Sequence, residues 1–281
     1  MSTTHTAWQL GKYQILGEVG RGGMAIVYRA LDPDLGRPVA IKVLLDALAA
    51  DPEFVKRFRN EARMAARLQH PNIVTIHDVG AQATTAGVKH FMVMEFLAGP
   101  NLDQLISQRG PLALTSAAQV IEQVAAALEE AQRADMVHRD IKPANIMVGA
   151  DGRIRLTDFG LVRAAEATGL TQHGQIMGTP DYMAPEQARG EPIDHRTDIY
   201  SLGIVLYKML NGQSPFARSD PMATMYAHVT QPLPLDGALA ALPRDVKRVI
   251  QKATAKRASD RYQTAGAFAA DLLRATHAQP N

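Results

Sequence analysis

Two short runs in the middle of the chain carry the side chains with the clearest capacity for chemistry. They are His138-Arg139-Asp140-Ile141-Lys142-Pro143-Ala144-Asn145 and Asp158-Phe159-Gly160. Asp140 could accept the proton of an attacking hydroxyl, while Asn145 and Asp158 offer oxygen ligands for Mg²⁺. Lys142 adds a positive charge that would offset the charge on transferred phosphoryl oxygens. Phosphoryl transfer needs all three components, so the two runs indicate that reaction. A single aspartate in a loop is more often a turn former or a cap, but two such runs in order are poorly explained that way.

A lysine and a glutamate upstream fit the same reaction. In Val39-Ala40-Ile41-Lys42, strand alternation places Ala40 and Lys42 on one face and Val39, Ile41 and Val43 on the other. Taken alone, Lys42 reads equally well as a solvated edge residue. Glu61 falls on the apolar face of a predicted helix, where an unpaired carboxylate would be costly. Pairing with Glu61 would hold Lys42 extended over phosphates.

Three glycines, Gly20, Gly22 and Gly23, lie between two predicted strands. Glycine there lets backbone N–H groups approach a phosphate chain closely. Alone, the run is more often only a turn, and Ala25 replaces the third glycine of the usual G-x-G-x-x-G pattern. A Rossmann dinucleotide site is excluded, because residues 26–30 form another strand where that site needs a helix.

The pattern of apolar residues divides the chain into two parts. Up to about residue 96 it predicts strands over 13–19, 26–30, 38–44, 73–79 and 90–96. One helix interrupts them, capped by Asp51 with Pro52 at its first position and running to about Gln69.

Beyond Gly99 helices dominate the pattern. Ser116 and Gln119 predict a capping box that opens a helix to about Ala134. Further helices are predicted near 197–211, 221–229, 244–255 and 264–274. The long stretch from 136 to 186 has few periodic signals, which is typical of functional loops.

Composition excludes several classes of protein. Hydrophobic residues make up 46% of the 281 residues and charged residues 21%, so the chain can bury a sizeable core. A net charge of +2 is no basis for nucleic-acid binding, and the absence of cysteine excludes disulfides and thiolate chemistry. The longest apolar run, residues 199–210, contains Lys208 and is interpreted as a buried helix rather than a membrane span.

These motifs together resemble the eukaryotic-like protein kinases, and within them the bacterial serine/threonine branch. The resemblance covers about residues 13–274. It extends to Gly178-Thr179-Pro180, Ala184-Pro185-Glu186, Asp198-Ile199-Tyr200-Ser201-Leu202-Gly203 and Arg261. It implies an α+β, two-lobed protein-kinase-like fold, with a small five-stranded antiparallel N-lobe carrying one helix and a larger, mostly helical C-lobe. The expected divisions are an N-terminal extension (1–12), a kinase domain (13–274; N-lobe 13–96, hinge 95–99, C-lobe 100–274) and a polar tail (275–281).

The resemblance also implies roles for the matched residues. The catalytic residues would be Asp140, Lys142, Lys42 and Glu61, and the metal ligands Asn145 and Asp158. ATP would be bound by Gly20, Gly22, Gly23, Val27, Ala40, Lys42, Met94, Glu95, Leu97 and Met147. Thr179 would contact Asp140 and Lys142. Glu186, Asp198 and Arg261 would be structural, with Glu186 and Arg261 forming a buried ion pair. Lys142, two residues after Asp140, is typical of the serine/threonine class.

A regulatory site is expected in the polar loop from 168 to 175. Thr171 is predicted to be autophosphorylated, with Thr168 as a secondary site. The resemblance brings Arg139, Arg163 and Arg57 toward this point, where three guanidinium groups would repel one another. A phosphate would neutralise them and order the loop.

The sequence thus predicts ATP- and Mg²⁺-dependent phosphorylation of serine or threonine in proteins, with Mn²⁺ as an alternative metal. Two alternatives stay open: a pseudokinase that serves as a binding or scaffold module, and a small-molecule kinase on the same fold. The retained catalytic and metal residues argue against the first, and the peptide-docking segment 178–186 against the second. Expected partners are protein substrates and a second copy for trans-autophosphorylation, with no nucleic acid and no membrane segment. The expected location is the cytoplasm, either as a free enzyme or as the cytoplasmic domain of a longer membrane-anchored receptor kinase.

Overall fold

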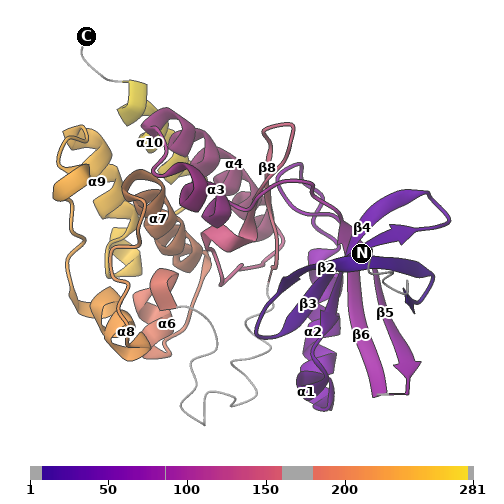
Figure 1. Ribbon diagram of the computed structural model, residues 1–281. Helices are drawn as coiled ribbons and strands as arrows, with labels where there is room; N and C mark the ends of the chain where they lie inside the picture. The colour runs from indigo at the N-terminus through magenta and orange to yellow at the C-terminus, as the bar shows by residue number, and fades with distance from the viewer. Residues whose placement is uncertain (1–7, 86, 160–179, 278–281) are drawn as a thin grey trace. The chain divides into compact units, whose positions relative to one another are not determined.

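A computed structural model of the chain describes residues 8–85, 87–159 and 180–277 (Figure 1). The described residues form two compact units. The first contains residues 8–69 and 74–98, and the second contains residues 70–73, 99–159 and 180–277. The short loop 70–73 belongs to the second unit because Asn72 donates hydrogen bonds to Gln123 (3.0 Å) and to the carbonyl of Ile154 (2.7 Å).

An antiparallel sheet of six strands forms the first unit, in the order β1-β2-β3-β4-β6-β5 (Figure 1). The strands are β1 (Gln9–Leu10), β2 (Tyr13–Arg21), β3 (Ala25–Asp32), β4 (Arg37–Leu44), β5 (Ile76–Thr84) and β6 (Gly87–Glu95). The prediction of five strands was one short, since β1 lies in the expected N-terminal extension and pairs with β2 through Gln9–Gln14 and Leu10–Tyr13. A two-residue strand is too short to show an alternating pattern.

The two faces of this sheet have different roles. Val39, Ile41 and Val43 of β4 point into one core together with Phe91 and Val93 of β6. The opposite face of β4 carries Ala40, Lys42 and Leu44, as the alternation predicts. Leu44 packs there against the helices α1 (Asp46–Ala49) and α2 (Pro52–Ala65). The face that holds Lys42 is therefore the face that α2 covers.

Helix α2 begins as the sequence predicts, with the Asp51 carboxylate accepting from the backbone N–H groups of Glu53 (2.9 Å) and Phe54 (3.4 Å). It ends at Ala65 and not at about Gln69. The backbone N–H groups of Arg67 and Leu68 bond to carbonyls three residues earlier, which closes the helix in a tight turn. Pro71 follows shortly, and it would not tolerate a helix running up to it. The one-turn helix α1 was not predicted.

The second unit is built mainly of helices. They are α3 (Leu102–Arg109), α4 (Leu114–Arg133), α6 (Pro185–Arg189), α7 (His195–Asn211), α8 (Pro221–Thr230), α9 (Arg244–Ala253) and α10 (Ala265–His277). Between α4 and α6 the described residues include a 3₁₀ turn η1 (Pro143–Asn145), a hairpin of β7 (Ile146–Val148) and β8 (Ile154–Leu156), and a 3₁₀ turn η3 (Pro180–Tyr182). Two more 3₁₀ turns, η4 (Gly237–Leu239) and η5 (Ala258–Asp260), flank α9.

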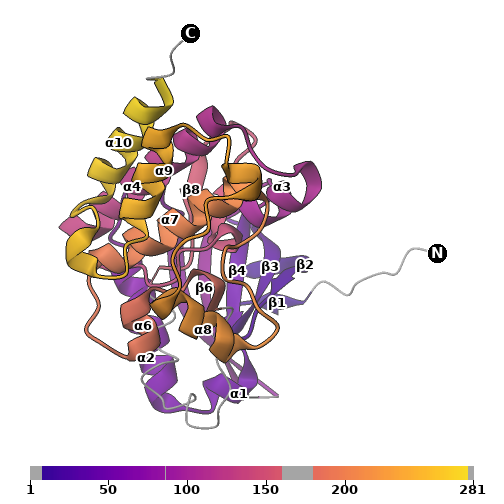
Figure 2. The ribbon, with the colours of Figure 1, turned by 90° about the vertical axis from the view of Figure 1, so that its left-hand side faces the viewer.

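Helix α7 is the centre of this unit and is buried along nearly its whole length. Helices α4 and α10 pack together beside it (Figure 2). Among the described helices, none combines the length and the apolar character needed to cross a bilayer.

The predicted capping box of α4 was wrong. The helix begins at Leu114 with Ala113 as its N-cap, so Ser116 and Gln119 lie inside it. The capping box belongs instead to α3, which was not predicted. There the Asn101 side chain accepts from the backbone N–H of Gln104 (2.8 Å), and the Gln104 side chain accepts from the backbone N–H of Asn101 (3.0 Å).

Candidate active site

An apolar cluster on the first unit surrounds the base of Lys42. Ala40, Val74 and Met94 are buried there, and Val27, Phe96 and Leu97 pack against them. Lys42 lies opposite Val27 and Met92 in the sheet register and is 9% exposed. Apolar side chains next to a lysine fit a nucleotide, whose base has apolar faces and whose phosphates are anionic. The sequence named Val27, Ala40, Met94 and Leu97 among the ATP-binding residues and placed Phe96 in the hinge, but it did not name Val74.

The three predicted phosphate-binding glycines are not explained by the packing of the protein itself. A Cβ added at Gly20 or Gly23 would meet nothing within 4 Å, and at Gly22 only the carbonyl of Ala25 at 3.8 Å. None of the three has a positive φ. Neither crowding nor backbone conformation requires glycine here, and the predicted close approach of a ligand stays a prediction. Ala25, at the third glycine position of the G-x-G-x-x-G pattern, is buried at the start of β3.

Glu61 lies on α2, which packs on the sheet face that carries Lys42. The buried stripe of α2 consists of Phe54, Phe58, Ala62 and Ala65, and Glu61 lies beside that stripe with intermediate exposure. The predicted pairing of Glu61 with Lys42 stays a prediction.

Glu95, at the end of β6, accepts a hydrogen bond from the N–H of Thr75 (3.0 Å) and donates its own N–H to the carbonyl of Thr75 (2.9 Å). These two hydrogen bonds fix the chain just before Leu97.

The second unit brings Asp140, Lys142 and Asn145 together. Lys142 Nζ lies 2.7 Å from Oδ2 of Asp140, and Asn145 Nδ2 lies 3.0 Å from the same oxygen. Asn145 Nδ2 also donates to the backbone carbonyl of Asp140 (2.8 Å). Both side-chain bonds end on Oδ2, so Oδ1 of Asp140 is the oxygen left for another group.

The backbone of this loop is held by a buried carboxylate on α7. Asp198 accepts from the N–H groups of His138 (2.7 Å) and Arg139 (2.8 Å). Burial raises the pKa of Asp198, while these bonds and the neighbouring Arg139 charge act in the opposite direction. Arg139 has φ of +70°, a left-handed conformation that is uncommon for residues other than glycine. Two bonds hold it there, since Gln187 on α6 also donates to the Arg139 carbonyl (3.0 Å).

His138 connects this loop to the strand that precedes Asp158. Its Nδ1 accepts the N–H of Asp140 (3.2 Å), so Nε2 carries the proton and donates to the carbonyl of Thr157 (2.8 Å). The Phe159 ring lies 4.5 Å from the His138 ring between centroids. Asp158, between these two anchors, also has a left-handed backbone with φ of +65°.

The donor set on this unit fits a divalent cation. Asn145 turns its amide nitrogen toward Asp140, which directs its Oδ1 oxygen away from that carboxylate. The N–H of Thr157 donates to the carbonyl of Asn145 (2.9 Å), which ties the end of η1, where Asn145 lies, to the segment after β8 that carries Asp158. One amide oxygen and one carboxylate are the hard oxygen ligands that Mg²⁺ uses. Met147, expected beside the adenine, lies on β7 opposite Arg155.

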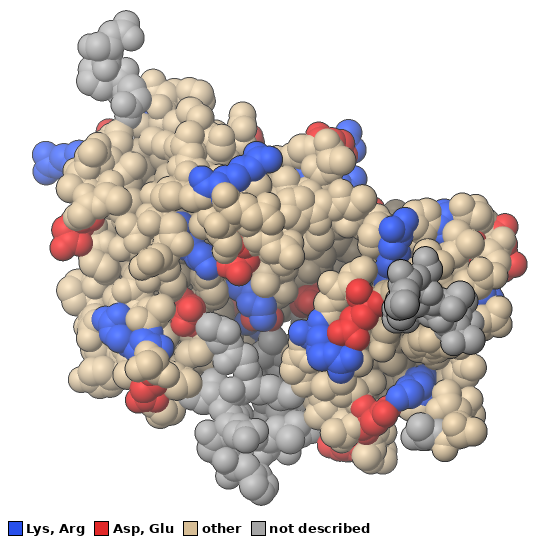
Figure 3. Space-filling view, in the orientation of Figure 1, with Lys and Arg blue, Asp and Glu red and all other residues tan. Residues whose placement is uncertain are grey.

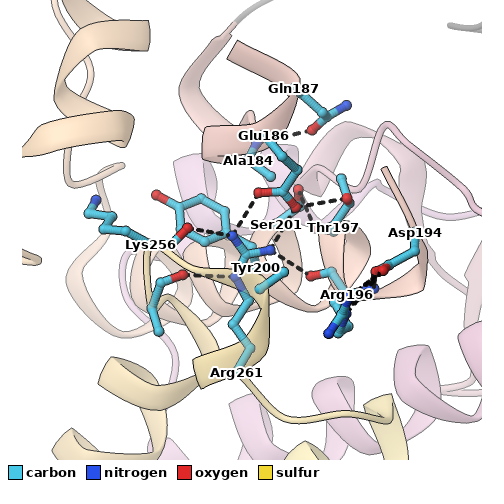
Figure 4. Close-up of polar contacts among 12 residues, drawn as sticks. Ala184, Glu186, Gln187, Asp194, Arg196, Thr197, Tyr200, Ser201, Lys256 and Arg261 are labelled. Carbon is cyan, nitrogen blue, oxygen red and sulfur yellow. Dashed lines mark hydrogen bonds and ion pairs between the residues drawn. The ribbon is translucent and has the colours of Figure 1, made fainter. Parts of the chain in front are cut away.

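A buried ion pair between Glu186 and Arg261 holds α6 (Figure 4). Both guanidinium nitrogens lie 2.7 Å from the two carboxylate oxygens, and Thr197 donates a further bond to Glu186 (2.8 Å). Burial by itself would raise the pKa of Glu186, but the bonds and charge of Arg261 hold it below the usual value. Because Gln187 follows Glu186 directly, this anchor also positions the bond to Arg139.

Several predicted residues lie outside the described part of the chain. They are Gly160, Arg163, Thr168, Thr171, Gly178 and Thr179. Arg57, expected to join Arg139 and Arg163 around a phosphate, is on α2. Its Nε is buried and, among the described residues, has no hydrogen-bond partner. Gln187 was missed by the sequence reading, although it follows the Ala184-Pro185-Glu186 motif immediately.

Comparison with known proteins agrees with the fold. The profile of the protein kinase domain matches residues 13–276. The chain therefore belongs to the protein kinase family. The expected kinase fold, with its sheet-containing N-lobe and helical C-lobe, is confirmed apart from the additional strand β1.

Within that family the chain is similar to serine/threonine-protein kinases of mycobacteria. It is 43% identical to PknB of Mycobacterium tuberculosis over 269 residues, which covers 94% of this chain and 43% of that protein. It is 40% identical to PknA of the same species over 263 residues, covering 92% of this chain and 60% of PknA. The chain thus spans less than two thirds of these relatives. A crystal structure of the PknI kinase domain of M. tuberculosis covers 96% of this chain with a TM-score of 0.77 and 28% identity. The expected class, a serine/threonine protein kinase of bacterial type, is confirmed at the level of the family.

Proposed function

We propose that this chain transfers the γ-phosphoryl group of ATP to serine or threonine hydroxyls of protein substrates, with Mg²⁺ as the metal. The observation that carries the proposal is the geometry of Asp140. Lys142 and Asn145 bind one oxygen of its carboxylate, and the other oxygen is left to accept a substrate hydroxyl. The similarity to serine/threonine kinases supports the same reaction.

Each residue of the site has a distinct task in this proposal. Asp140 orients the hydroxyl and takes its proton as the oxygen attacks phosphorus. Lys142, 2.7 Å from Asp140, fixes that carboxylate and offsets charge on the transferred group. Mg²⁺, held by Asn145 and Asp158, would neutralise charge on the phosphates when bound, and Mn²⁺ would satisfy the same ligands.

The first unit binds the nucleotide in this proposal. The cluster of Ala40, Val74 and Met94 receives the adenine, and Lys42 reaches the phosphates from the same face of the sheet. Gly20, Gly22 and Gly23 leave room for the phosphate chain, and Glu61 pairs with Lys42. Lys42 is 9% exposed, and a buried lysine of this kind requires an anionic neighbour.

A direct assay separates this proposal from its alternatives. The purified chain is incubated with ATP, Mg²⁺ and a generic basic protein, and phosphate on serine or threonine is measured. Transfer to protein supports the kinase. ATP binding without any transfer would favour a pseudokinase, and transfer only to small hydroxylated molecules would favour a small-molecule kinase.

Regulation by autophosphorylation at Thr171, with Thr168 as a secondary site, is part of the proposal. It is supported by Arg57, whose buried Nε would gain a partner from an added phosphate. Mass spectrometry of the 161–183 segment after incubation with ATP tests it, and full activity without phosphate in that segment would refute it. The reaction in trans requires a second copy of the chain as partner. Since the reaction consumes ATP, we place the domain in the cytoplasm.

A further inference from the structure

Gln187, the residue after Glu186 on α6 (Figure 4), uses both ends of its side-chain amide. Its Oε1 accepts the backbone N–H of Ala184 (3.0 Å), and its Nε2 donates to the backbone carbonyl of Arg139 (3.0 Å). The first bond satisfies an N–H group at the start of α6, as a glutamine often does at the third position of a helix. The second bond leaves the helix and reaches a residue 48 positions earlier in the chain. Capping of α6 therefore explains only one of the two bonds.

The pair of bonds requires a glutamine in one orientation. If the amide were turned over, its NH2 group would face the N–H of Ala184 and its oxygen would face the carbonyl of Arg139, so neither bond would form. An ionised glutamate at this position would keep an acceptor for Ala184 but would have no donor for Arg139. The bond to Arg139 is thus a separate property of the side chain, which a substitution can remove without removing the cap.

The carbonyl that Gln187 binds belongs to the peptide group just before Asp140. The N–H of the same peptide group belongs to Asp140 and donates to Nδ1 of His138 (3.2 Å). Because a peptide group is planar, bonds at both of its polar ends fix the plane from which the Asp140 side chain extends. Gln187 supplies one of these two bonds from a different element of the same unit.

The backbone next to this peptide group is strained. Arg139 has φ of +70°, and a left-handed backbone is unfavourable for a residue with a Cβ atom. Asp198 on α7 holds the N–H of Arg139 (2.8 Å), and Gln187 holds its carbonyl. Strained backbone persists only where surrounding groups over-determine it. Loss of the Gln187 bond would release the carbonyl, and its rotation would turn Asp140.

The direction of Asp140 is critical because one oxygen of its carboxylate is already bound. Lys142 (2.7 Å) and Asn145 (3.0 Å) both bind Oδ2, so Oδ1 is the oxygen that would meet a substrate hydroxyl. A rotation of the backbone behind Asp140 would move Oδ1 relative to that hydroxyl. Misplacement of a reacting group lowers the rate of a transfer step, while the affinity for the nucleotide depends on other residues.

We propose that Gln187 is a positioning residue for phosphoryl transfer, which directs the Asp140 carboxylate by holding the Arg139 carbonyl. This inference rests on the proposed kinase function and deepens it. It makes the rate of the reaction depend on the placement of α6, which the buried pair of Glu186 and Arg261 anchors.

Two substitutions at Gln187 separate its two bonds. Gln187→Glu keeps the size of the side chain and the acceptor for Ala184, but it removes the donor. Gln187→Met keeps the length of the side chain and removes both bonds. Gln104→Glu is the matched control, because Gln104 is at the third position of α3 and accepts the N–H of Asn101 (3.0 Å) in the same way. The chain has 30 basic and 28 acidic residues, and Figure 3 shows both signs interspersed on the displayed face, so one added carboxylate changes the general field little.

The assay measures Tm, together with kcat and KM for ATP and for a basic protein substrate, and kcat is expressed per mole of protein that binds ATP. We expect both Gln187 variants to lower kcat by about tenfold, the upper range for one hydrogen bond, with KM for ATP unchanged. Gln187→Glu should keep the Tm of the wild type because the cap is retained, and Gln104→Glu should keep kcat. A role limited to capping predicts a different pattern, with normal kcat in Gln187→Glu and a loss only in Gln187→Met.

A double-mutant cycle tests whether Gln187 acts through Asp140. In an Asp140→Asn background, which lacks the carboxylate to be directed, Gln187→Glu should lower the residual rate by less than about twofold. A loss as large as in the wild-type background would show that Gln187 acts on the fold and not through Asp140, and it would overturn the inference.

The outcomes separate this inference from the function on which it rests. If the wild type transfers no phosphate to any protein, the proposed function fails. If it transfers phosphate and either Gln187 variant keeps the wild-type kcat, the positioning role is wrong while the kinase function stands. An equal loss of kcat in Gln104→Glu would show that the added charge is responsible, which also overturns the role.

Discussion

Breaking the ion pair between Glu186 and Arg261 should destabilise the protein far more than breaking a pair on its surface. The Arg261 side chain is fully buried and that of Glu186 is 10% exposed. Arg261→Ala leaves the Glu186 carboxylate with the Thr197 hydroxyl as its one remaining side-chain donor among the described residues. It also removes bonds to the backbone carbonyls of Ala255 (2.8 Å) and Arg196 (3.0 Å).

The expected magnitude follows from the burial of the pair. Removing one partner of a buried pair costs about 3–5 kcal/mol. Whole domains are stable by only about 5–15 kcal/mol, so this loss is a large fraction of the total. With about 2–4 °C of Tm for each kcal/mol in a domain of this size, Tm should fall by about 6–20 °C.

Thermal and urea unfolding of four proteins provides the assay. Arg261→Ala is compared with wild type, with the double variant Arg261→Met/Glu186→Met and with Arg248→Ala, which breaks an exposed pair with Asp245. The double variant should recover much of the loss because no uncompensated charge is left buried. Arg248→Ala should change stability by less than about 1 kcal/mol. Equal effects of Arg261→Ala and Arg248→Ala would refute the reasoning.

Three other changes test separate features of the molecule. Gly22→Ala should leave Tm unchanged, since a Cβ there meets only a carbonyl at 3.8 Å, but it should weaken ATP binding. Gly36→Ala, at a turn outside the proposed site, is the control. An equal loss of ATP affinity in both variants would contradict the role proposed for Gly22. His228 is buried, and burial with the neighbouring Lys256 charge lowers its pKa to about 3. The unfolded state therefore binds the extra proton as pH falls below about 6.5, and about 2 kcal/mol of stability should be lost between pH 7 and pH 5; an unchanged pH slope in His228→Gln would refute this. Substitutions of Lys42 and Glu61 should each reduce activity, and their combination should add little, whereas fully additive losses in a double-mutant cycle would show that the two residues do not act together.

The regular elements were predictable where a period or a cap is strong. The strand alternation around Lys42 and the Asp51 cap of α2 are both as predicted, because each depends on local geometry. The errors occur where local signals are weak or ambiguous. Strand β1 is too short to show a period, and α4 starts at Leu114 without any side-chain cap.

The residue types of the loop from His138 to Asn145 indicated its proposed role, but they did not give its geometry. The sequence placed Asp140, Lys142 and Asn145 in one run, yet it could not show that both partners bind the same carboxylate oxygen. The Gln187 bond to the Arg139 carbonyl joins residues 48 positions apart. Such pairs depend on how helices pack, so no local pattern reveals them. Val74 was missed for the same reason, since it lies outside β4 and β6 and reaches the cluster of Ala40 and Met94 only in the folded chain.

The central claim, that Asp140 supports phosphoryl transfer to protein, is tested most directly by comparing the chain with its Asp140→Asn variant. Both are incubated with γ-labelled ATP, Mg²⁺ and a basic protein, and ATP affinity is measured in parallel. We predict that the variant binds ATP as well as the wild type but transfers phosphate about 10²–10⁴-fold more slowly, the range expected for a positioned general base. Near-normal transfer by the variant, or ATP binding without any transfer by the wild type, would contradict the claim.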